Sequence, residues 1–324
     1  MKKIIGVGNA LVDILVHIES DKVLDELQLQ KGAVCFTTDE QQRRVDEQIR
    51  KLNPVISAGG SAANTMKAAA QLGLEATYVG KIGKDDMGRA FSQALREQGV
   101  IPVLLETDAA PTGTASTLIS PDGQRSFADQ LGAATLLQAH EITALPFRNY
   151  DALYMEGYLV SDHGFAQAIL RQAKADGLLT CLDLASYNIV QEDSAFFRQL
   201  LAEEVDIAFA NEEESWALTG LPPREAVRKM AGWCSVAVVK TGAQGAMACS
   251  GKEIVESAAI PVPKVVDTTG AGDSFAAGFL WAWFDGRTLT ACLDAGNAVA
   301  AEMIQHIGAT LPAEVWTAIR THIQ

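Results

Sequence analysis

Short runs of apolar and β-branched residues alternate along the chain with segments in which apolar residues recur at helical spacing. The runs predict strands, and the periodic segments between them predict helices. The predicted strands are residues 4–7, 77–79, 152–155, 179–182, 207–209 and 236–239, and the clearest helices are residues 64–72, 87–98, 164–175 and 212–218. This alternation favours an α/β fold with a mainly parallel sheet covered by helices on both faces. Ligands of such sheets bind at the carboxyl ends of the strands.

Two segments interrupt the alternation. Residues 11–36 predict a strand, a short helix and a second strand, and residues 112–130 predict a hairpin whose turn is Pro121-Asp122-Gly123. Because neither segment is followed by a crossover helix, we expect them to pair into a small separate sheet. Two short hairpins are marginally stable alone, so this sheet should rest on the core of a single domain that spans residues 1–324. A lid is its expected role, and a static edge or a dimerisation surface is the alternative.

The most informative segment is DTTGAGD at residues 267–273. Apolar residues 260–266 precede it and a helical pattern follows it, so the run predicts a strand, a glycine turn and a helix start. Bare amides of Gly270, Ala271 and Gly272 at a helix N-terminus form an anion site. Asp273 would repel a phosphate bound there, and a general base that deprotonates an attacking hydroxyl is a reason for its presence. The alternative is that Asp273 is only the helix N-cap.

Two other phosphate-binding motifs are excluded by the sequence. Gly270 and Gly272 form G-x-G, but the next glycine is Gly278, which is too far along the chain for the dinucleotide fingerprint G-x-G-x-x-G. No segment has the pattern G-x-x-x-x-G-K-[ST] of a P-loop.

Four motifs resemble those of the PfkB, or ribokinase-like, carbohydrate kinases, and they occur in the order of that family. DTTGAGDSF resembles its C-terminal motif, AGGSAAN at 58–64 its glycine motif, NEEE at 211–214 its N-x-x-E motif, and GNALVD at 8–13 its first strand and substrate-binding Asp. The motifs span essentially the whole chain. Other stretches, such as PTGTASTLI from Pro111 and HIGATLP near the end, look most similar to the adenosine kinase branch.

The resemblance implies a ribokinase-like fold and ATP-dependent phosphorylation of a primary hydroxyl. It implies ATP and Mg²⁺ as cofactors, with K⁺ as a further candidate. Adenosine is the first expected acceptor, and ribose, fructose or a related ketose is the alternative. A non-catalytic sugar- or nucleotide-binding sensor on the same fold is another alternative, because fold does not fix function. A hydrolase with water as acceptor is a third, although a lid that excludes water disfavours it.

The acceptor site is predicted around Asp13, whose carboxylate lies in an apolar strand. Burying such a carboxylate destabilises the fold unless it accepts hydrogen bonds. The donors could be backbone amides or the hydroxyls of a bound sugar, and both interpretations stay open. Ser61 could equally be an ordinary helix cap. The resemblance implies an acceptor pocket formed by Asn9, Asp13, Gly59, Gly60, Ser61 and Asn64, with Glu156 at its edge. Some sugar kinases of the family are similar in carrying an acid near Glu156, where animal adenosine kinases carry a small residue.

The nucleotide site is predicted at the ends of later strands. Asn211 and Glu214, three residues apart at a helix start, fit both a capping box and a Mg²⁺ site that acts through water. The glycine loop after strand 236–239 fits a nucleotide loop and a plain tight turn equally. The resemblance implies that ATP is bound by Asn211, Lys240, Thr241, Gly242, Gly245 and Asn297, that Glu214 orders Mg²⁺, and that Asp267 and Thr269 are candidates for a monovalent cation site.

The net charge limits the kinds of binding partner, and the cysteines indicate the compartment. The net charge of −14 argues against a nucleic-acid surface or an anionic membrane, but not against a nucleotide site with local donors. No apolar run approaches the ~20 residues of a membrane span. The five cysteines are widely spaced without C-x-x-C, which is typical of reduced core residues in a cytoplasmic protein. The expected partners are the small acceptor and ATP, with the protein a monomer or a homodimer.

Overall fold

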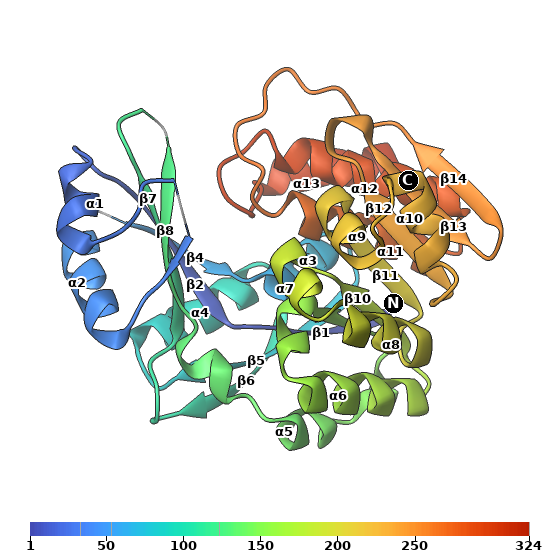
Figure 1. The fold of residues 1–324 in the computed structure, drawn as a ribbon, viewed down its shortest axis with the longest axis horizontal. Helices are drawn as coiled ribbons and strands as arrows, with labels where there is room; N and C mark the ends of the chain where they lie inside the picture. The colour runs from blue at the N-terminus through green and yellow to red at the C-terminus, as the bar shows by residue number, and fades with distance from the viewer. Residues whose placement is uncertain (33, 53, 123, 324) are drawn as a thin grey trace.

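The computed structural model describes residues 1–32, 34–52, 54–122 and 124–323. Its main sheet has the strand order β14-β13-β12-β11-β10-β9-β1-β5-β6 (Figure 1). The parallel strands are β1 (Lys3–Val7), β5 (Glu75–Gly83), β6 (Ile101–Thr107), β9 (Ala152–Glu156), β10 (Leu179–Asp183), β11 (Ile207–Asn211) and β12 (Val236–Lys240). All six predicted strands lie in this sheet. An antiparallel hairpin of β13 (Ala246–Ser250) and β14 (Glu253–Ser257), which the sequence analysis did not predict, extends one edge.

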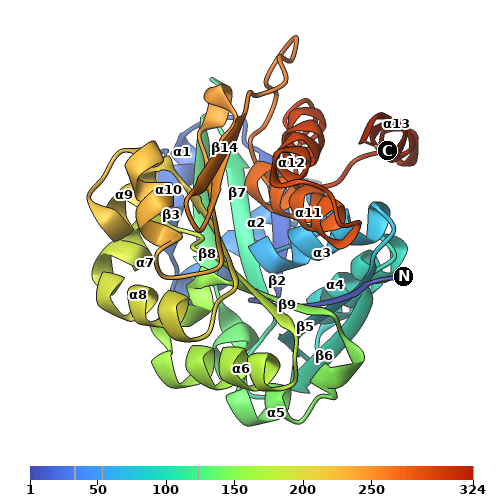
Figure 2. The same cartoon turned by 90° about the vertical axis from the view of Figure 1, so that its right-hand side faces the viewer.

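Helices cover both faces of the main sheet, as the alternating pattern predicted. Neighbouring residues of one strand face opposite sides: Ile4 belongs to one apolar core and Ile5 to the other. The first core is formed with α3 (Ser61–Gln71), α4 (Asp86–Glu97), α11 (Ala271–Phe284), α12 (Leu289–Met303) and α13 (Ala313–Ile323). The second is formed with α6 (His163–Ala175), α7 (Tyr187–Glu192), α8 (Ser194–Glu203), α9 (Glu212–Thr219) and α10 (Pro223–Met230), with α5 (Ala139–Thr143) beside α6. Figure 2 shows the two layers from the side.

A second, smaller sheet stands beside the main body (Figures 1 and 2). Its strand order is β3-β8-β7-β2-β4, formed by β2 (Leu11–His17), β3 (Val34–Phe36), β4 (Val55–Gly59), β7 (Gly113–Ile119) and β8 (Arg125–Gln130). The expected pairing of the two interrupting segments is therefore confirmed, and β4 is an addition. The predicted turn residue Gly123 lies outside the described residues.

The small sheet has one apolar face and one face that is open toward the main body. Val12, Ile14 and Val16 of β2 are buried in a core that they share with α1 (Lys22–Leu27) and α2 (Asp39–Ile49). The intervening residues of β2 point the other way. Leu11 and Asp13 line the cleft between this sheet and the main body. We call the five strands and their two helices the lid.

One predicted strand is wrong. Residues 260–266, expected as the strand before the glycine turn, form a loop that continues from the end of β14. Their apolar side chains are not in the core: Ile260, Val265 and Val266 are 40%, 53% and 41% exposed. Apolar content alone cannot distinguish a loop of this length from a buried strand. Here four of its seven residues line a cleft, and none pairs with a neighbouring strand.

In the part of the chain that the structure describes, no helix combines the length and the apolar character that crossing a bilayer would require.

Candidate active site

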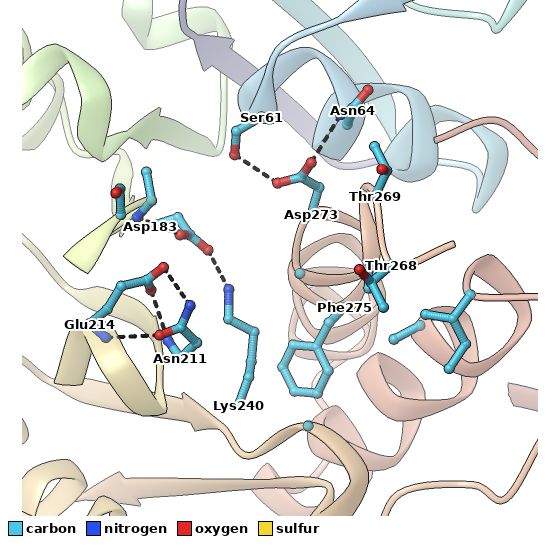
Figure 3. A pocket seen from close by; sticks show the side chains of 18 of the residues that line it. Ser61, Asn64, Asp183, Asn211, Glu214, Lys240, Thr268, Thr269, Asp273 and Phe275 are labelled. Atoms are coloured by element: carbon cyan, nitrogen blue, oxygen red, sulfur yellow. Dashed lines mark hydrogen bonds and ion pairs between the residues drawn. The ribbon is translucent and has the colours of Figure 1, made fainter. Parts of the chain in front are cut away.

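Four neighbouring strands of the main sheet each end in a polar residue. Glu156, Asp183, Asn211 and Lys240 are the last residues of β9, β10, β11 and β12. The register pairs Asp183 with Glu156 and Asn211 with Lys240. Parallel strands place their carboxyl ends at one edge, so these side chains converge there. They line one wall of a cleft of about 1460 Å³, which the lid and the N-termini of α3 and α11 complete. Figure 3 shows Asp183, Asn211 and Lys240 in this cleft.

Asp273 lies at the centre of this cleft, in the first turn of α11. The Ser61 hydroxyl donates a hydrogen bond to its Oδ1 over 2.7 Å, and the Asn64 amide donates to its Oδ2 over 3.0 Å (Figure 3). Burial raises the pKa of Asp273 to about 6, although the Ser61 bond opposes the shift. The carboxylate is thus held by the first turn of α3, which packs beside α11.

The two capping interpretations for this region are wrong. The N-cap of α11 is Gly270, and Asp273 makes no capping bond to its own helix. The N-cap of α3 is Gly60, so Ser61 stands inside the helix and uses its hydroxyl on Asp273. Both polar side chains are therefore directed to each other and not to local backbone amides.

A lysine lies next to the glycine loop at the start of α11. A Cβ added to Gly272 would lie 3.0 Å from Lys240 Nζ, so the ammonium group is close to this backbone. Lys240 Nζ is also 2.8 Å from Asp183 Oδ2. Burial disfavours the charged lysine, but Asp183 and Glu214 outweigh it and the net pKa of Lys240 is raised. The Lys240 ammonium group therefore adds a full positive charge beside the helix N-terminus, and together they suit a bound phosphate group.

At the lid side of the cleft, the Asp13 carboxylate has no hydrogen-bond donor among the described residues. Burial raises its pKa to about 6, while the buried Lys67 ammonium lowers it. Gly59 lies against this carboxylate: a Cβ added there would come within 2.1 Å of Asp13 Oδ1. Asn64 Oδ1 is likewise buried without a partner. Backbone amides therefore do not satisfy Asp13, which leaves both side chains able to accept bonds from hydroxyls.

Glu156 holds two parts of the site together. Its Oε1 accepts the backbone N–H of Asn9 over 2.8 Å, and its Oε2 accepts the N–H of Ala62 over 2.9 Å. Burial raises the pKa of Glu156 to about 7, and the two amide bonds oppose the shift. The carboxylate connects the end of β1 to the first turn of α3. Asn9 also lines the cleft.

At the opposite end, Asn211 and Glu214 form a complete capping box at the start of α9. Glu214 accepts the backbone N–H of Asn211 over 2.8 Å and its side-chain amide over 2.7 Å. The capping interpretation is confirmed, and both residues still line the cleft. Burial and the neighbouring Asp183 raise the pKa of Glu214 to about 7.

Of the remaining residues predicted for the nucleotide site, some line the cleft and others hold the loops that form it. Gly242 and Gly245 line the cleft, but Thr241 does not. Instead its N–H donates to the Gly245 carbonyl over 2.8 Å and closes the loop. The Asn297 amide donates to the Ser257 hydroxyl over 2.9 Å and to two carbonyls of the same loop. It lines the cleft and also fixes the chain that leads into it.

Asp267 and Thr269 lie together beneath the glycine loop. Asp267 Oδ1 accepts the hydroxyl of Thr269 over 2.8 Å and its N–H over 3.0 Å, and Oδ2 accepts the N–H of Gly308 over 2.8 Å. These bonds shape the loop. Across the described residues, no group of three or more His, Cys, Asp or Glu side chains is arranged to hold a metal ion.

Three cleft features escaped the sequence analysis. Asp183 follows the predicted strand 179–182 directly, so the rule that ligand groups sit at carboxyl strand ends could have found it. Asp129 of β8 lines the cleft from the lid, and only the strand register reveals it. The third feature is an apolar wall from the loop after β14, formed by Ile260, Pro261, Val262 and Val265.

Comparisons with known proteins agree with this geometry. The sequence matches the model of the pfkB family carbohydrate kinases over residues 33–316. An adenosine kinase of Schizophyllum commune is 28% identical, with 94% of this chain and 96% of that protein covered. A solved adenosine kinase from Sinorhizobium meliloti is 32% identical, with a TM-score of 0.87 and 99% of each chain covered. A solved probable sugar kinase from Rhizobium etli is 31% identical with the same TM-score, covering 100% of this chain and 99% of that one.

Proposed function

The chain belongs to the pfkB family of carbohydrate kinases, with a ribokinase-like fold and ATP-dependent phosphotransferase activity, and we propose that its acceptor is the primary hydroxyl of a nucleoside such as adenosine. The observation that carries the mechanism is the position of Asp273. It lies between an anion-binding loop and two side chains of α3, at the centre of the cleft.

In the proposed reaction, Asp273 removes the proton from the acceptor hydroxyl as the hydroxyl oxygen attacks the γ-phosphorus of ATP. The bond between this phosphorus and the β–γ bridging oxygen breaks, and ADP leaves with that oxygen. The raised pKa of about 6 leaves the carboxylate ionised at neutral pH and a better base than an exposed aspartate. The amides of Gly270, Ala271 and Gly272 stabilise charge that develops on the phosphoryl oxygens. Lys240 adds a positive charge beside Gly272.

The ends of the cleft suit the two substrates differently. The apolar wall with Ile260 and Val265, next to Gly242 and Asn297, suits the flat base of ATP. The lid side offers Asp13, Gly60 and Asn64, which suit the hydroxyls of a ribose ring. In this arrangement the reacting hydroxyl lies between the two ends, at Asp273.

The residues around Glu214 fit a role in holding Mg²⁺ on the nucleotide. Mg²⁺ bound to phosphates keeps several waters and needs few protein ligands, so the lack of a three-carboxylate group among the described residues is compatible with it. Glu214 and Asp183 face the cleft with spare lone pairs for such waters. Bound there, the ion would neutralise charge on the phosphates. The monovalent cation site at Asp267 and Thr269 stays a prediction.

The nucleoside is favoured over a sugar by two arguments. Relatives that cover nearly the whole chain are named adenosine kinases. Glu156, which suggested sugar hydroxyls, uses both oxygens on backbone amides. A sugar kinase is the second candidate, favoured by the name of the Rhizobium etli protein.

A coupled assay of ADP release with adenosine, ribose, fructose or no acceptor tests the proposal. We expect kcat/KM for adenosine to exceed that for either sugar, because a pocket shaped for one class of acceptor discriminates against the other. Turnover of ribose or fructose without turnover of adenosine would overturn the acceptor and leave the phosphotransferase standing. Equal ADP release without any acceptor would indicate a hydrolase, and no release with any of them would favour a sensor.

A further inference from the structure

The lid presents an aspartate to the cleft for which the mechanism above has no use. Asp129 of β8 lines the cleft, and its Oδ1 is buried without a hydrogen-bond partner among the described residues. Asp13 is the charged group that acts on it most directly, and burial together with Asp13 raises the pKa of Asp129 to about 7. A buried carboxylate oxygen without a donor destabilises the empty protein. Such an atom is explained when a ligand supplies the missing bond.

The strand register places Asp129 on the same face of the lid as Asp13. Asp13 of β2 is paired with Ala115 of β7, and Ala115 is paired with Asp129 of β8. Residues that are directly opposite on neighbouring strands share a face. The two carboxylates therefore flank the small Ala115 side chain, and two strand spacings put their backbones roughly 10 Å apart.

This separation suits the proposed nucleoside acceptor. A nucleoside whose ribose is held by Asp13 extends beyond the ring by the length of its base. A carboxylate can only accept hydrogen bonds while it is ionised, so its partner on the base must be a donor. The exocyclic amino group of adenine is such a donor.

We propose that Asp129 is a specificity-determining residue that accepts a hydrogen bond from the exocyclic amino group of a nucleoside base. This inference rests on the proposed function, because it concerns the acceptor of the same site. It adds the class of nucleoside: those whose base carries an amino group, in preference to those that lack one. A hydrogen bond to a charged group corresponds to about tenfold to a hundredfold in affinity.

The test compares adenosine with purine riboside, which lacks only the amino group. The measured quantity is the ratio of kcat/KM for the two nucleosides in one enzyme preparation, which does not depend on the folded fraction. We expect a ratio of about ten to a hundred in the wild type and a ratio near one in Asp129→Ala. Asp129→Asn keeps one acceptor oxygen without the charge, so its ratio should fall in between.

Asp122→Asn is the matched control. Asp122 lies on the same lid, but it is exposed and paired with Lys31 over 2.7 Å. This variant should keep the wild-type ratio. A wild-type ratio near one, or an unchanged ratio in Asp129→Ala, would overturn the inference while leaving nucleoside phosphorylation in place. Failure of the wild type to phosphorylate either nucleoside would overturn the proposed acceptor as well.

Discussion

At the scale of single residues, the bonds around Asp273 allow the base to be removed without removing the fold. Asparagine at this position can still accept the Ser61 hydroxyl. Its amide would face the Asn64 amide, but Asn64 Oδ1 has no partner and can turn to accept the new donor. Asp273→Asn should therefore fold normally and lack only the proton acceptor.

We expect Asp273→Asn to lower kcat by about 10²–10⁴-fold with little change in ATP affinity. Steady-state kinetics, an ATP titration and a thermal melt provide the measurement. Asp285→Asn is the control, because Asp285 follows the last turn of the same helix and pairs with Arg287 at the surface. If Asp273→Asn retained half of the wild-type kcat while chemistry limits the rate, Asp273 would have no part in proton transfer.

The pH dependence of the wild type should report the same residue. A general base works in its deprotonated form, so activity should be lost as the pH falls through the Asp273 pKa of about 6. Asp13 has a raised pKa of about 6 as well, and its protonation should weaken acceptor binding. We expect kcat/KM for the acceptor to be level only above about pH 8, since Asp129 with a pKa of about 7 must also be ionised, and to fall by tenfold or more per unit below about pH 6. A profile that stays flat down to about pH 5 would contradict both assignments.

The residues that the sequence could identify are those that belong to contiguous motifs. Asp273, Asn64 and Asn211 stand in short segments whose residue types and spacing carry chemical meaning. Asp183 and Asp129 stand in ordinary strands, and their position in the site depends on which strands pair and in what register. Strand order and register arise from long-range packing, so a local pattern cannot supply them.

At the scale of elements, two junctions between lid and body pack tightly against each other. Gly60, between β4 and α3, has φ +88°, and a Cβ there would lie 2.4 Å from the Asn9 carbonyl oxygen at the junction of β1 and β2. One junction thus packs against the other. The resemblance implied only that Gly60 belongs to the acceptor pocket, whereas the structure also shows a close approach of the backbone itself.

Gly60→Ala should therefore destabilise the protein and disturb the acceptor site together. The matched control is Gly73→Ala, because Gly73 has φ +98° but no heavy atom within 4 Å of its added Cβ. Backbone strain should cost about 1–2 kcal/mol of unfolding free energy in both variants, and the steric clash adds to it only in Gly60→Ala. Chemical denaturation measures the difference. Equal destabilisation of the two variants would mean that the junction relaxes without cost.

Elements with a strong period were predicted well, and elements without one were not. The six predicted strands and four helices exist because buried strands and amphipathic helices leave a regular pattern. Residues 260–266 carry the same apolar content for another reason, since they line the cleft. Apolar and polar residues alternate only weakly along the hairpin β13–β14, because it lies at the sheet edge, where Glu253 and Glu256 are exposed.

At the scale of the whole molecule, the cleft concentrates carboxylates in a protein that is already acidic. The net charge is −14. Cleft carboxyl groups with pKa values raised by burial are Asp13, Asp129, Glu156, Glu214 and Asp273. A carboxyl group whose pKa is higher in the folded state gives the most stability when protonated, and that contribution is lost as the pH rises. The binding site should therefore destabilise the empty protein at neutral pH.

Asp129 offers a direct test of this trade-off, because its Oδ1 has no partner to lose among the described residues. Its pKa rises from 3.8 in the unfolded chain to about 7 in the fold, so the ionised group destabilises the protein increasingly from about pH 4 up to about pH 7. Asp129→Asn removes this effect with little change of shape. We expect the variant without ligands to melt about 3–8 °C above the wild type at about pH 8, and the gap to narrow toward about pH 5.

The sign of the effect distinguishes this explanation from a general benefit of removing negative charge. Asp122→Asn removes one negative charge from the same lid, but the Lys31 ammonium holds the pKa of Asp122 below its usual value. Neutralising Asp122 should therefore leave the melting temperature unchanged or lower it. Equal stabilisation by both variants would point to net charge alone. A melting temperature of Asp129→Asn at or below that of the wild type at about pH 8 would mean that Asp129 supports the fold, and its unpartnered oxygen would then need another explanation.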